Sequence, residues 1–400
     1  MSTWSTKKFS EITEFIQGGG TPSTNDISYW NGNVSWLTPA EITNHPDMYI
    51  SDTKRHITEN GVANSSAKVF EPNTVLMASR ATIGTVVLNS LPMATNQGFI
   101  NIKPKEELNP EFLYFWINAN RNFLESQGTG STFREISKGI FKNLEISYPK
   151  KETQNSVVYI LKTIKSKINT LNKNIQQYKQ LKQSLMEKLF YSVTDLPNGW
   201  EVKKAGEVVD IVKKSKVITG DSPIPFIPMS LIADDSLYCR NFEMKRKDNI
   251  ASGTYFENKS LLVSKITPCF ENGKQGIADI PNEYGITSTE IIPLKSKSNT
   301  FNIKYLHYLL IEKNRRVYLA STMEGTTGRQ RLKTNVLLDL LIPVAPLEEQ
   351  NRIIDLLEGI DQKVDLIKGK LTLYNNLFNS LLHKLMNQEI DVSNLEFENA

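Results

Sequence analysis

Residues 152–190 read ETQNSVVYILKTIKSKINTLNKNIQQYKQLKQSLMEKLF, and residues 348–386 read EEQNRIIDLLEGIDQKVDLIKGKLTLYNNLFNSLLHKLM. Shifted by 196 positions, the two segments align without a gap and are identical at 12 of 39 positions. The identical pairs include Glu152/Glu348, Gln154/Gln350, Asn155/Asn351, Tyr178/Tyr374 and Leu189/Leu385. The chain therefore contains a tandem duplication, and this duplication decides the architecture.

Both segments carry an apolar stripe with the spacing of a coiled coil. The first stripe consists of Leu161, Ile164, Ile168, Leu171, Ile175 and Tyr178 and continues through Leu181, Leu185 and Leu189. The second consists of Ile353, Leu357, Ile360, Val364, Ile367, Leu371, Tyr374, Phe378, Leu381 and Leu385. Steps that alternate between three and four residues place such side chains along one seam of a helix. We therefore predict two long helices, within 151–192 and 346–390, each about 58 Å long.

The charges of the two segments are opposite in balance. Residues 150–190 contain nine Lys or Arg and two acidic residues, whereas residues 346–390 contain five and seven. This difference favours pairing of the two helices with each other over pairing of like with like. We expect the pair to be antiparallel. The alternative is that the two charged faces are solvated and differ by chance.

The segments before the helices, 1–150 and 197–345, predict two globular domains of similar fold, and residues 391–400 form a tail. Their openings match at the same shift, Trp4-Ser-Thr-Lys-Lys against Trp200-Glu-Val-Lys-Lys. Apolar runs predict strands at Val34–Leu37, Thr74–Met77, Phe99–Lys103, Ser260–Val263 and Ile291–Leu294. Short helices are predicted at Pro110–Asn120 and Ile303–Asn314. The expected fold class is α+β, with the two similar domains separated by an antiparallel coiled coil.

Composition describes an ordinary soluble protein. The 400 residues include 47 Lys or Arg and 43 Asp or Glu, a net charge of +4 that neither requires nor excludes nucleic-acid binding. Cys239 and Cys269 form no CxxC pair, and the four histidines stand singly, so we predict neither a disulfide framework nor a metal site. No apolar run predicts a secretory signal or a membrane span. These features together predict a cytoplasmic protein.

Three segments resemble catalytic motifs without completing them. Asn109-Pro110-Glu111-Phe112 differs from the base-gripping motif of adenine methyltransferases at its third residue and is interpreted as an Asn-Pro helix start. Asp47 and Asp52 lie too close in sequence to occupy adjacent strands of a nuclease core. Gly18-Gly19-Gly20 lacks the GK[ST] ending of a phosphate-binding loop and is interpreted as a turn. The sequence therefore predicts a protein without catalytic residues or a cofactor of its own.

Basic and amide side chains in the variable segments are the candidate DNA contacts. Arginine and lysine neutralise phosphates or bind guanine, and glutamine matches adenine. The candidates are Arg80, Arg134, Lys138, Lys214, Lys265, Lys274, Arg329, Gln330 and Arg331. Two glycine-containing loops at corresponding places, Gly128–Arg134 and Gly325–Arg331, hold several of them. The alternative interpretations are that each cluster is a solvated surface and that the glycines only make turns.

Taken together, the motifs resemble the specificity subunits of type I restriction-modification systems over essentially the full length. The similarity is carried by the order of several segments and not by any one of them. They are Trp4 with Phe9-Ser-Glu-Ile, Gly18-Gly-Gly-Thr-Pro22, Tyr29-Trp30 with Trp36, Ser79-Arg80-Ala-Thr-Ile-Gly84, Asn96-Gln97-Gly98, and Ile342-Pro343-Val-Ala-Pro346-Leu-Glu-Glu-Gln350.

The resemblance implies two target recognition domains that read the halves of a split, asymmetric DNA site, with the coiled coil setting the gap between them. It implies two methyltransferase subunits, which bind S-adenosylmethionine, and restriction subunits, which use ATP. The family's turn onto the helix falls on Pro346, Leu347, Glu349 and Gln350 and implies a contact with these partners. Its counterpart in the first repeat retains only Glu152 and Gln154, which puts the equivalence of the two contacts in doubt. The rival functions are a self-contained methyltransferase or nuclease, which lacks its motifs here, and a purely structural scaffold.

Overall fold

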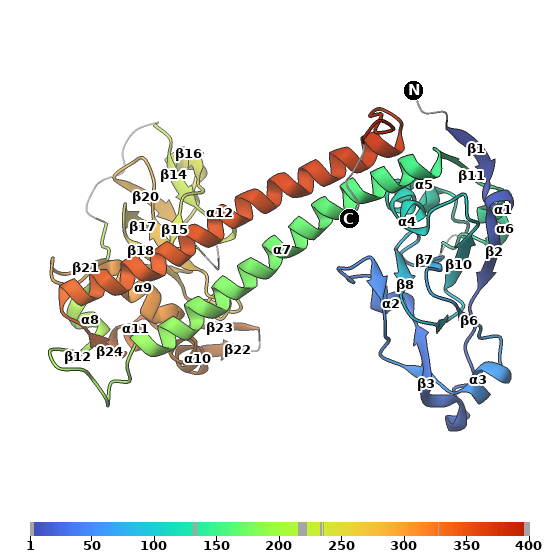
Figure 1. Cartoon of the computed structure of the whole chain (residues 1–400). Coiled ribbons are helices and arrows are strands. Elements are labelled where there is room, and N and C mark those ends of the chain that lie inside the picture. The colour runs from blue at the N-terminus through green and yellow to red at the C-terminus, as the bar shows by residue number, and fades with distance from the viewer. Residues whose placement is uncertain are drawn as a thin grey trace. The chain divides into compact units, whose positions relative to one another are not determined.

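The computed structural model describes residues 4–130, 134–214, 222–232, 234, 236–326 and 328–395. The chain forms two compact units. Unit 1 comprises Met1–Thr170 with Thr372–Ala400, and unit 2 comprises Leu171–Leu371. Figure 1 shows the elements of each unit. Each long helix is shared, because its first part belongs to one unit and its last part to the other.

Unit 1 contains three sheets and a set of short helices. The five-stranded sheet has the order β2 (Thr13–Gly18), β10 (Phe99–Pro104), β7 (Val75–Ala78), β8 (Val86–Asn89), β4 (Tyr49–Ile50). The four-stranded sheet has the order β5 (His56–Ile57), β3 (Trp30–Leu37), β9 (Met93–Thr95), β6 (Val69–Phe70). A third pairing joins β1 (Ser5–Lys8) and β11 (Glu145–Tyr148). The helices are α1 (Phe9–Ile12), η1 (Ile27–Tyr29), α2 (Pro39–Ile42), α3 (Glu59–Ala63), α4 (Pro110–Ala119), α5 (Arg121–Ser126) and α6 (Lys138–Asn143).

Unit 2 repeats this topology strand for strand. Its five-stranded sheet has the order β13 (Val209–Ile211), β21 (Ile291–Ser296), β18 (Leu261–Ser264), β19 (Gln275–Ala278), β15 (Tyr238–Cys239). Its four-stranded sheet has the order β16 (Glu243–Lys245), β14 (Ile224–Ile227), β20 (Tyr284–Thr287), β17 (Thr254–Glu257), and β12 (Glu201–Lys204) pairs with β24 (Leu341–Val344). The helices are α8 (Ala205–Val208), η2 (Met229–Leu231), η3 (Lys247–Asn249), α9 (Ile303–Ile311), α10 (Lys313–Ser321) and α11 (Thr334–Asp339). A small hairpin, β22 (Glu324–Thr326) with β23 (Arg329–Arg331), is added.

The parallel pairings confirm that the two folds are copies. In unit 1, β3 pairs in parallel with β9 and β4 with β8. In unit 2, β14 pairs in parallel with β20 and β15 with β19, at the same places in the strand order. The predicted α+β class and the duplication are therefore confirmed. The predicted strands and short helices also form, with ends that differ by a few residues.

The central strands β7 and β18 are apolar on both sides because each five-stranded sheet lies between two cores. In β7, Val75 and Met77 contribute to the large core of unit 1, whereas Leu76 and Ala78 contribute to a second core with Leu37 of β3. Side chains alternate between the faces of a strand, so a continuous apolar run marks a strand that is covered on both faces. The same division occurs in β18, where Leu261 and Val263 face one core and Leu262 the other.

The two long helices, α7 (Lys151–Leu189) and α12 (Leu347–Met386), pair antiparallel within each unit. In unit 1, Val157 and Leu161 near the start of α7 share a core with Leu385 near the end of α12. In unit 2, Met186 near the end of α7 shares a core with Ile353 near the start of α12. The predicted antiparallel pairing is confirmed.

The seam of α7 departs from the predicted stripe after Tyr178. Leu181, which the stripe includes, is 47% exposed, whereas Leu185 and Leu189 pack partly buried against the core that contains Met186 and Phe190. The second repeat keeps its predicted stripe to the end, because Leu385 is buried, and Leu377, which is 45% exposed, lies outside that stripe. A straight helix turns by about 20° per heptad relative to a 3.5-residue repeat, so the buried stripe moves across the helix surface over several turns. The expectation that Leu181 continues the seam is therefore wrong.

Candidate nucleic-acid interface

The predicted recognition loop of unit 2 is a hairpin held against its sheet. The backbone N–H of Thr267 donates to the Gln330 carbonyl oxygen at 3.0 Å, and the backbone N–H of Gln330 donates to Thr267 Oγ1 at 2.9 Å. Gly325 and Gly328 have φ values of 142° and 79°, which explains why glycine occupies both positions. Thr327 lies outside the described residues. The hairpin therefore has a defined conformation that other residue types would strain.

The three predicted hairpin contacts differ in what their side chains do. Arg331 donates two hydrogen bonds to the Glu290 carboxylate, from Nη2 to Oε1 at 2.8 Å and from Nε to Oε2 at 3.0 Å, and lowers the pKa of Glu290. Gln330 is half-buried and belongs to the backbone contact with Thr267. Arg329 is exposed, and no acceptor among the described residues pairs with it. Arg329 is therefore the member of this set that is free to meet a ligand.

In unit 1, the corresponding loop closes a pocket of about 460 Å³. Segments far apart in the sequence line it, namely Gly18 and Gly19, Ser79, Gln97, Thr129 and Gly130, and residues 135–138. Thr129 pairs with Glu135, and Arg80 Nε lies 3.9 Å from Glu135 Oε1. Residues 131–133 of this loop lie outside the described residues. The structure thus brings four of the sequence motifs to one place.

The glycine run at this pocket is required by packing. A Cβ atom on Gly19 would lie 2.2 Å from the Thr95 carbonyl oxygen, and one on Gly20 would lie 2.3 Å from the Ser66 backbone. Neither distance is possible for a real side chain. The interpretation of Gly18-Gly19-Gly20 as a turn is therefore wrong: Gly18 ends β2, and the glycines let the backbone pass directly against two neighbouring segments.

The remaining predicted contacts are scattered. Arg134 is exposed beside the pocket of unit 1, and Lys138 is exposed and lines it. Lys214 is exposed three residues after β13. Residues 215–221, which include Lys216 of the same basic cluster, are outside the described residues. Lys265 is half-buried near Glu290. Lys274 donates from Nζ to the carbonyl oxygens of Ile232 at 2.9 Å and Met229 at 3.3 Å, so its ammonium group stabilises the η2 turn. Because the Lys274 ammonium group already donates these two hydrogen bonds, it is a less favourable candidate for a phosphate contact.

The two glutamines of the helix-start motif, Gln154 and Gln350, are buried, and the side chain of each forms hydrogen bonds with three backbone groups. We call this contact the glutamine lock. Gln350 is 1% exposed, and its amide donates to the carbonyl oxygens of Ala345 at 2.8 Å and Thr300 at 3.2 Å while Oε1 accepts from the Asn302 backbone N–H at 2.9 Å. These bonds fix the first turn of α12 to the loop before α9. Burial leaves Gln350 no surface for a partner subunit, so its expected contact role is replaced by an internal one.

Unit 1 contains the same lock. Gln154 is fully buried, donates to the carbonyl oxygens of Pro149 and Glu107, each at 2.9 Å, and accepts from the Asn109 backbone N–H at 2.8 Å. The neighbouring asparagines also match, since Asn109 bonds Asn155 and Asn302 bonds Asn351. Of the other motif residues, Glu152, Pro346 and Leu347 are exposed and Glu349 is half-exposed with an ion pair to Arg352. Those four remain available for the predicted partner contact.

A charge-reversed clamp joins each short helix to its long helix. In unit 1, Glu111 of α4 accepts hydrogen bonds from Lys162 of α7 at 2.6 Å and from the Tyr49 hydroxyl at 2.9 Å. In unit 2 the charges exchange places, because Glu358 of α12 accepts from Lys304 of α9 at 2.7 Å and from the Tyr238 hydroxyl at 2.8 Å. Burial opposes ionisation of Glu358, but the bonds from Lys304 and Tyr238 hold its pKa below the usual value. Both units therefore have this ion pair between the short and the long helix, but the acidic and basic residues are exchanged between the two helices.

The reversal predicts the result of a charge swap in unit 1. Glu111→Lys alone places two ammonium groups together and should cost about 1–2 kcal/mol of unfolding free energy. Glu111→Lys combined with Lys162→Glu recreates the arrangement of unit 2 and should recover most of that loss, measured by urea unfolding. If the double variant were no more stable than the sum of the two single changes, the two clamps would not be equivalent.

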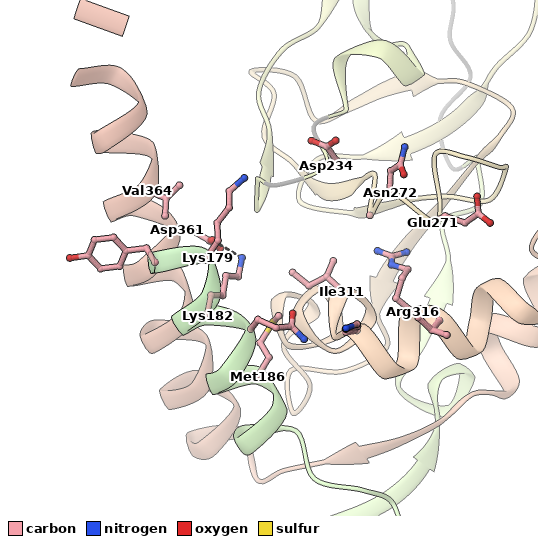
Figure 2. A pocket seen from close by; sticks show the side chains of 15 residues that line it. Lys179, Lys182, Met186, Asp234, Glu271, Asn272, Ile311, Arg316, Asp361 and Val364 are labelled. Carbon is pink, nitrogen blue, oxygen red and sulfur yellow. Dashed lines mark hydrogen bonds and ion pairs between the residues drawn. The ribbon is translucent and has the colours of Figure 1, made fainter. Parts of the chain in front are cut away.

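The polar groups between the helices of unit 2 have no counterpart in unit 1. Figure 2 shows a pocket of about 490 Å³ in which Lys182 of α7 meets Asp361 of α12, with Arg316 of α10 at the other side. Lys182 Nζ lies 2.5 Å from Asp361 Oδ1, and the Tyr308 hydroxyl donates to Oδ2 at 2.8 Å. At the repeat-related positions unit 1 has Phe378 and Lys165. The second unit therefore carries an ion pair where the first has an aromatic side chain.

A second buried polar chain lies next to this pair. Arg316 is 6% exposed, donates from Nη2 to Gln275 Oε1 at 2.6 Å and stacks 4.3 Å over Phe270. Gln275 in turn donates to the His307 carbonyl oxygen at 2.8 Å. Burial lowers the pKa of Arg316 to about 9 and holds the pKa of His307 well below its usual value. These hydrogen bonds join α10, β19 and α9 within unit 2.

The segments that resembled catalytic motifs have structural roles. Asn109 caps α4, since its side chain accepts from the backbone N–H groups of Glu111 and Phe112, as the helix-start interpretation predicted. Asp52 accepts from His56 at 2.8 Å and from Ser35 at 3.1 Å. Within the described residues, no group of three or more His, Cys, Asp or Glu side chains is arranged to hold a metal ion. In the same residues no helix combines the length and the apolarity needed to cross a membrane.

Known proteins show the same organisation. The type I restriction modification DNA specificity domain matches the chain twice, at residues 1–183 and 197–373. The MjaIX specificity subunit of Methanocaldococcus jannaschii is 26% identical over 98% of this chain and 94% of its own length. The EcoAI specificity subunit of Escherichia coli is 35% identical over 40% of this chain and 28% of its own length.

Solved structures share the fold. A type I restriction-modification S subunit from M. genitalium superposes with a TM-score of 0.60 at 16% identity and covers 96% of both chains. A chain from a study of complex assembly in a type I R-M system gives 0.60 at 18% identity, covering 96% of this chain and 97% of that one. With two copies of the domain on two copies of one fold, this chain belongs to the type I restriction-modification DNA specificity family.

Proposed function

We propose that the chain is the DNA-reading, non-catalytic subunit of a type I restriction-modification complex, and that each unit reads one half of a split DNA site. The observation that supports the proposal is that the two units share their strand order and internal contacts but differ in surface residues. The strand order, the glutamine locks and the clamps recur in both units. The bridge beside the glycine-containing loop differs, because it joins Arg80 to Glu135 in unit 1 and Ile266 to Arg331 in unit 2. A common frame with different surfaces suits the reading of two different sequences.

The chemistry belongs to partner subunits in this proposal. Methyltransferase subunits bind S-adenosylmethionine and restriction subunits use ATP, while this chain supplies sequence recognition. The two helices shared by the units fix the gap between the half-sites. Two free cysteines and a DNA substrate support a cytoplasmic location.

Two assays on the purified full-length chain test the proposal. The chain should bind mixed-sequence duplex DNA with an affinity that falls steeply as salt rises, because phosphate contacts release counterions. It should transfer no methyl group from S-adenosylmethionine alone and should do so at one bipartite sequence when a methyltransferase subunit is added. Methylation by the isolated chain would show a self-contained enzyme instead, and failure to bind DNA under any condition would favour a scaffold.

A further inference from the structure

One edge of unit 1 presents two cations, Lys54 and Arg55, that are not among the contacts predicted from the sequence. Strand β5 is the edge of the four-stranded sheet, and with the η1–β3 turn it lines a pocket of about 480 Å³. Figure 1 labels β3 and α3 at this end of unit 1, opposite α4 and α5. We call it the Arg55 surface, and it consists of Asn25, Ile27, Trp30, Asn31, Lys54 and Arg55.

The guanidinium group of Arg55 is held in place by two tryptophans. It lies 3.9 Å from the centre of the Trp30 ring and 5.0 Å from that of Trp36. The two rings meet edge to face at 5.1 Å, and each indole N–H donates to a backbone carbonyl oxygen, that of Ser23 for Trp30 and that of Gly20 for Trp36. Contact with both rings therefore restricts the position of the guanidinium group.

The edge of that guanidinium group is free. Arg55 is exposed, and within the part of the chain that the structure describes no carboxylate or carbonyl oxygen accepts from it. Other arginines are already engaged, as Arg80 is with Glu135, Arg240 with Asp279 and Arg331 with Glu290. A planar donor that is positioned but unpaired is suited to bidentate binding of guanine or phosphate.

The turn beside Arg55 is equally fixed. Asp26 caps η1 by accepting from the Ser28 backbone N–H, and the Thr58 hydroxyl donates to the Ser28 carbonyl oxygen at 2.8 Å. Asn31 has φ at 61°, a left-handed conformation that asparagine tolerates. Ile27 is 81% exposed at the tip of this turn. A rigid, exposed turn carrying amides and an apolar side chain can contact base edges at little entropic cost.

Unit 2 differs at the equivalent place. Trp36 and Phe226 occupy matching positions in their sheets, because they face Ala94 and Ile286 in the parallel pairings. The residue opposite Trp36 is Arg55, whose carbonyl oxygen accepts from the Trp36 backbone N–H, whereas the residue opposite Phe226 is Glu243. Glu243 pairs with Lys245 at 2.6 Å, and Lys245 lies over the Phe226 ring at 4.5 Å. The position that Arg55 occupies in unit 1 is thus taken by an acidic residue in unit 2.

We propose that the Arg55 surface is the DNA-reading face of unit 1, with Arg55 donating to a guanine or an equivalent base edge in the major groove and Lys54 binding a backbone phosphate. This inference rests on the proposed function and assigns it to particular residues. The positive charge of the surface complements duplex DNA, whose phosphates attract it. At the matching position unit 2 has Glu243 in place of Arg55, which makes the two half-sites different.

The test selects bound duplexes from a random-sequence pool with the full-length chain, alone and assembled with its methyltransferase partner, and sequences them. Wild type should enrich two separated blocks of sequence. Arg55→Lys keeps the charge, and a lysine can lie over an aromatic ring as Lys245 does, but it loses the planar fork. It should relax base preference within one block by about fivefold or more and leave the other block unchanged.

A charge variant and a control complete the experiment. Lys54→Ala should weaken binding of all sequences alike. It should also make the negative slope of log affinity against log salt less steep by about one. Lys105→Ala removes a lysine charge elsewhere on unit 1, where it bonds the Glu11 carbonyl oxygen, and should leave both blocks intact. If wild type enriches blocks and Arg55→Lys enriches the same blocks equally, this inference fails while the proposed function stands. If wild type enriches no sequence, the proposed function itself fails.

Discussion

Lys182→Met is expected to destabilise unit 2 by about 3–5 kcal/mol, because it leaves the Asp361 carboxylate buried without its cation. Both side chains are largely removed from water, with exposed fractions of 14% for Lys182 and 11% for Asp361. The Tyr308 hydroxyl remains as one donor to the carboxylate but carries no charge. Urea unfolding of the full-length chain measures the loss, and Lys188→Met, at an exposed position of the same helix, should change stability by less than about 0.5 kcal/mol.

The double variant Lys182→Met with Asp361→Leu separates the ion pair from the packing around it. Replacing a buried pair by apolar side chains is often neutral, so this variant should be clearly more stable than Lys182→Met alone. Unit 1 already has Phe378 where unit 2 has Lys182, which shows that the frame accepts an apolar side chain there. A double variant as unstable as the single one would mean that Lys182 acts through packing and not through its charge.

Gln350→Leu should cost about 3 kcal/mol, since three backbone groups lose their hydrogen-bond partner in a buried position. Gln154→Leu should have a similar effect on unit 1, because its contacts are the same. Gln177→Leu changes an exposed glutamine of α7 and serves as the control. Hydrogen exchange at the first turns of α7 and α12 should rise in the corresponding variant only. Equal effects of Gln350→Leu and Gln177→Leu on stability would show that the hydrogen bonds of Gln350 do not stabilise unit 2.

The sequence predicts the frame well because the frame repeats. Identity between residues 152–190 and 348–386 reveals two long helices, and apolar runs such as the one before Met77 reveal strands that are covered on both faces. The repeat also marks Gln154 and Gln350 as important. It does not say why, and the resemblance to a family suggested a partner contact where the structure has a buried lock.

The candidate interface is less predictable because side-chain pairing decides it. Nothing in the local sequence of Arg331 shows that Glu290, 41 positions earlier, would bind its guanidinium group. The stacking of Arg55 on Trp30 and Trp36 depends on the register between β3 and β5, which a single sequence does not reveal. The drift of the buried stripe from Leu181 to Met186 likewise follows from accumulated helix geometry.

The two units keep the same framework contacts but differ at exposed positions. Framework contacts are kept even when their charges exchange, as in the clamps of Glu111 with Lys162 and of Lys304 with Glu358. Exposed positions change freely between the copies, as Arg55 and Glu243 show. A frame under packing constraints can therefore carry different reading surfaces without loss of its fold.

The most direct test of the central claim is a map of the methylated bases in DNA from cells that express this chain with its methyltransferase partner. Two similar units that read separate half-sites predict one motif made of two specific blocks with a gap of fixed length between them, and Arg55→Lys should relax only one block. A single uninterrupted motif, or methylation that is independent of this chain, would contradict the account.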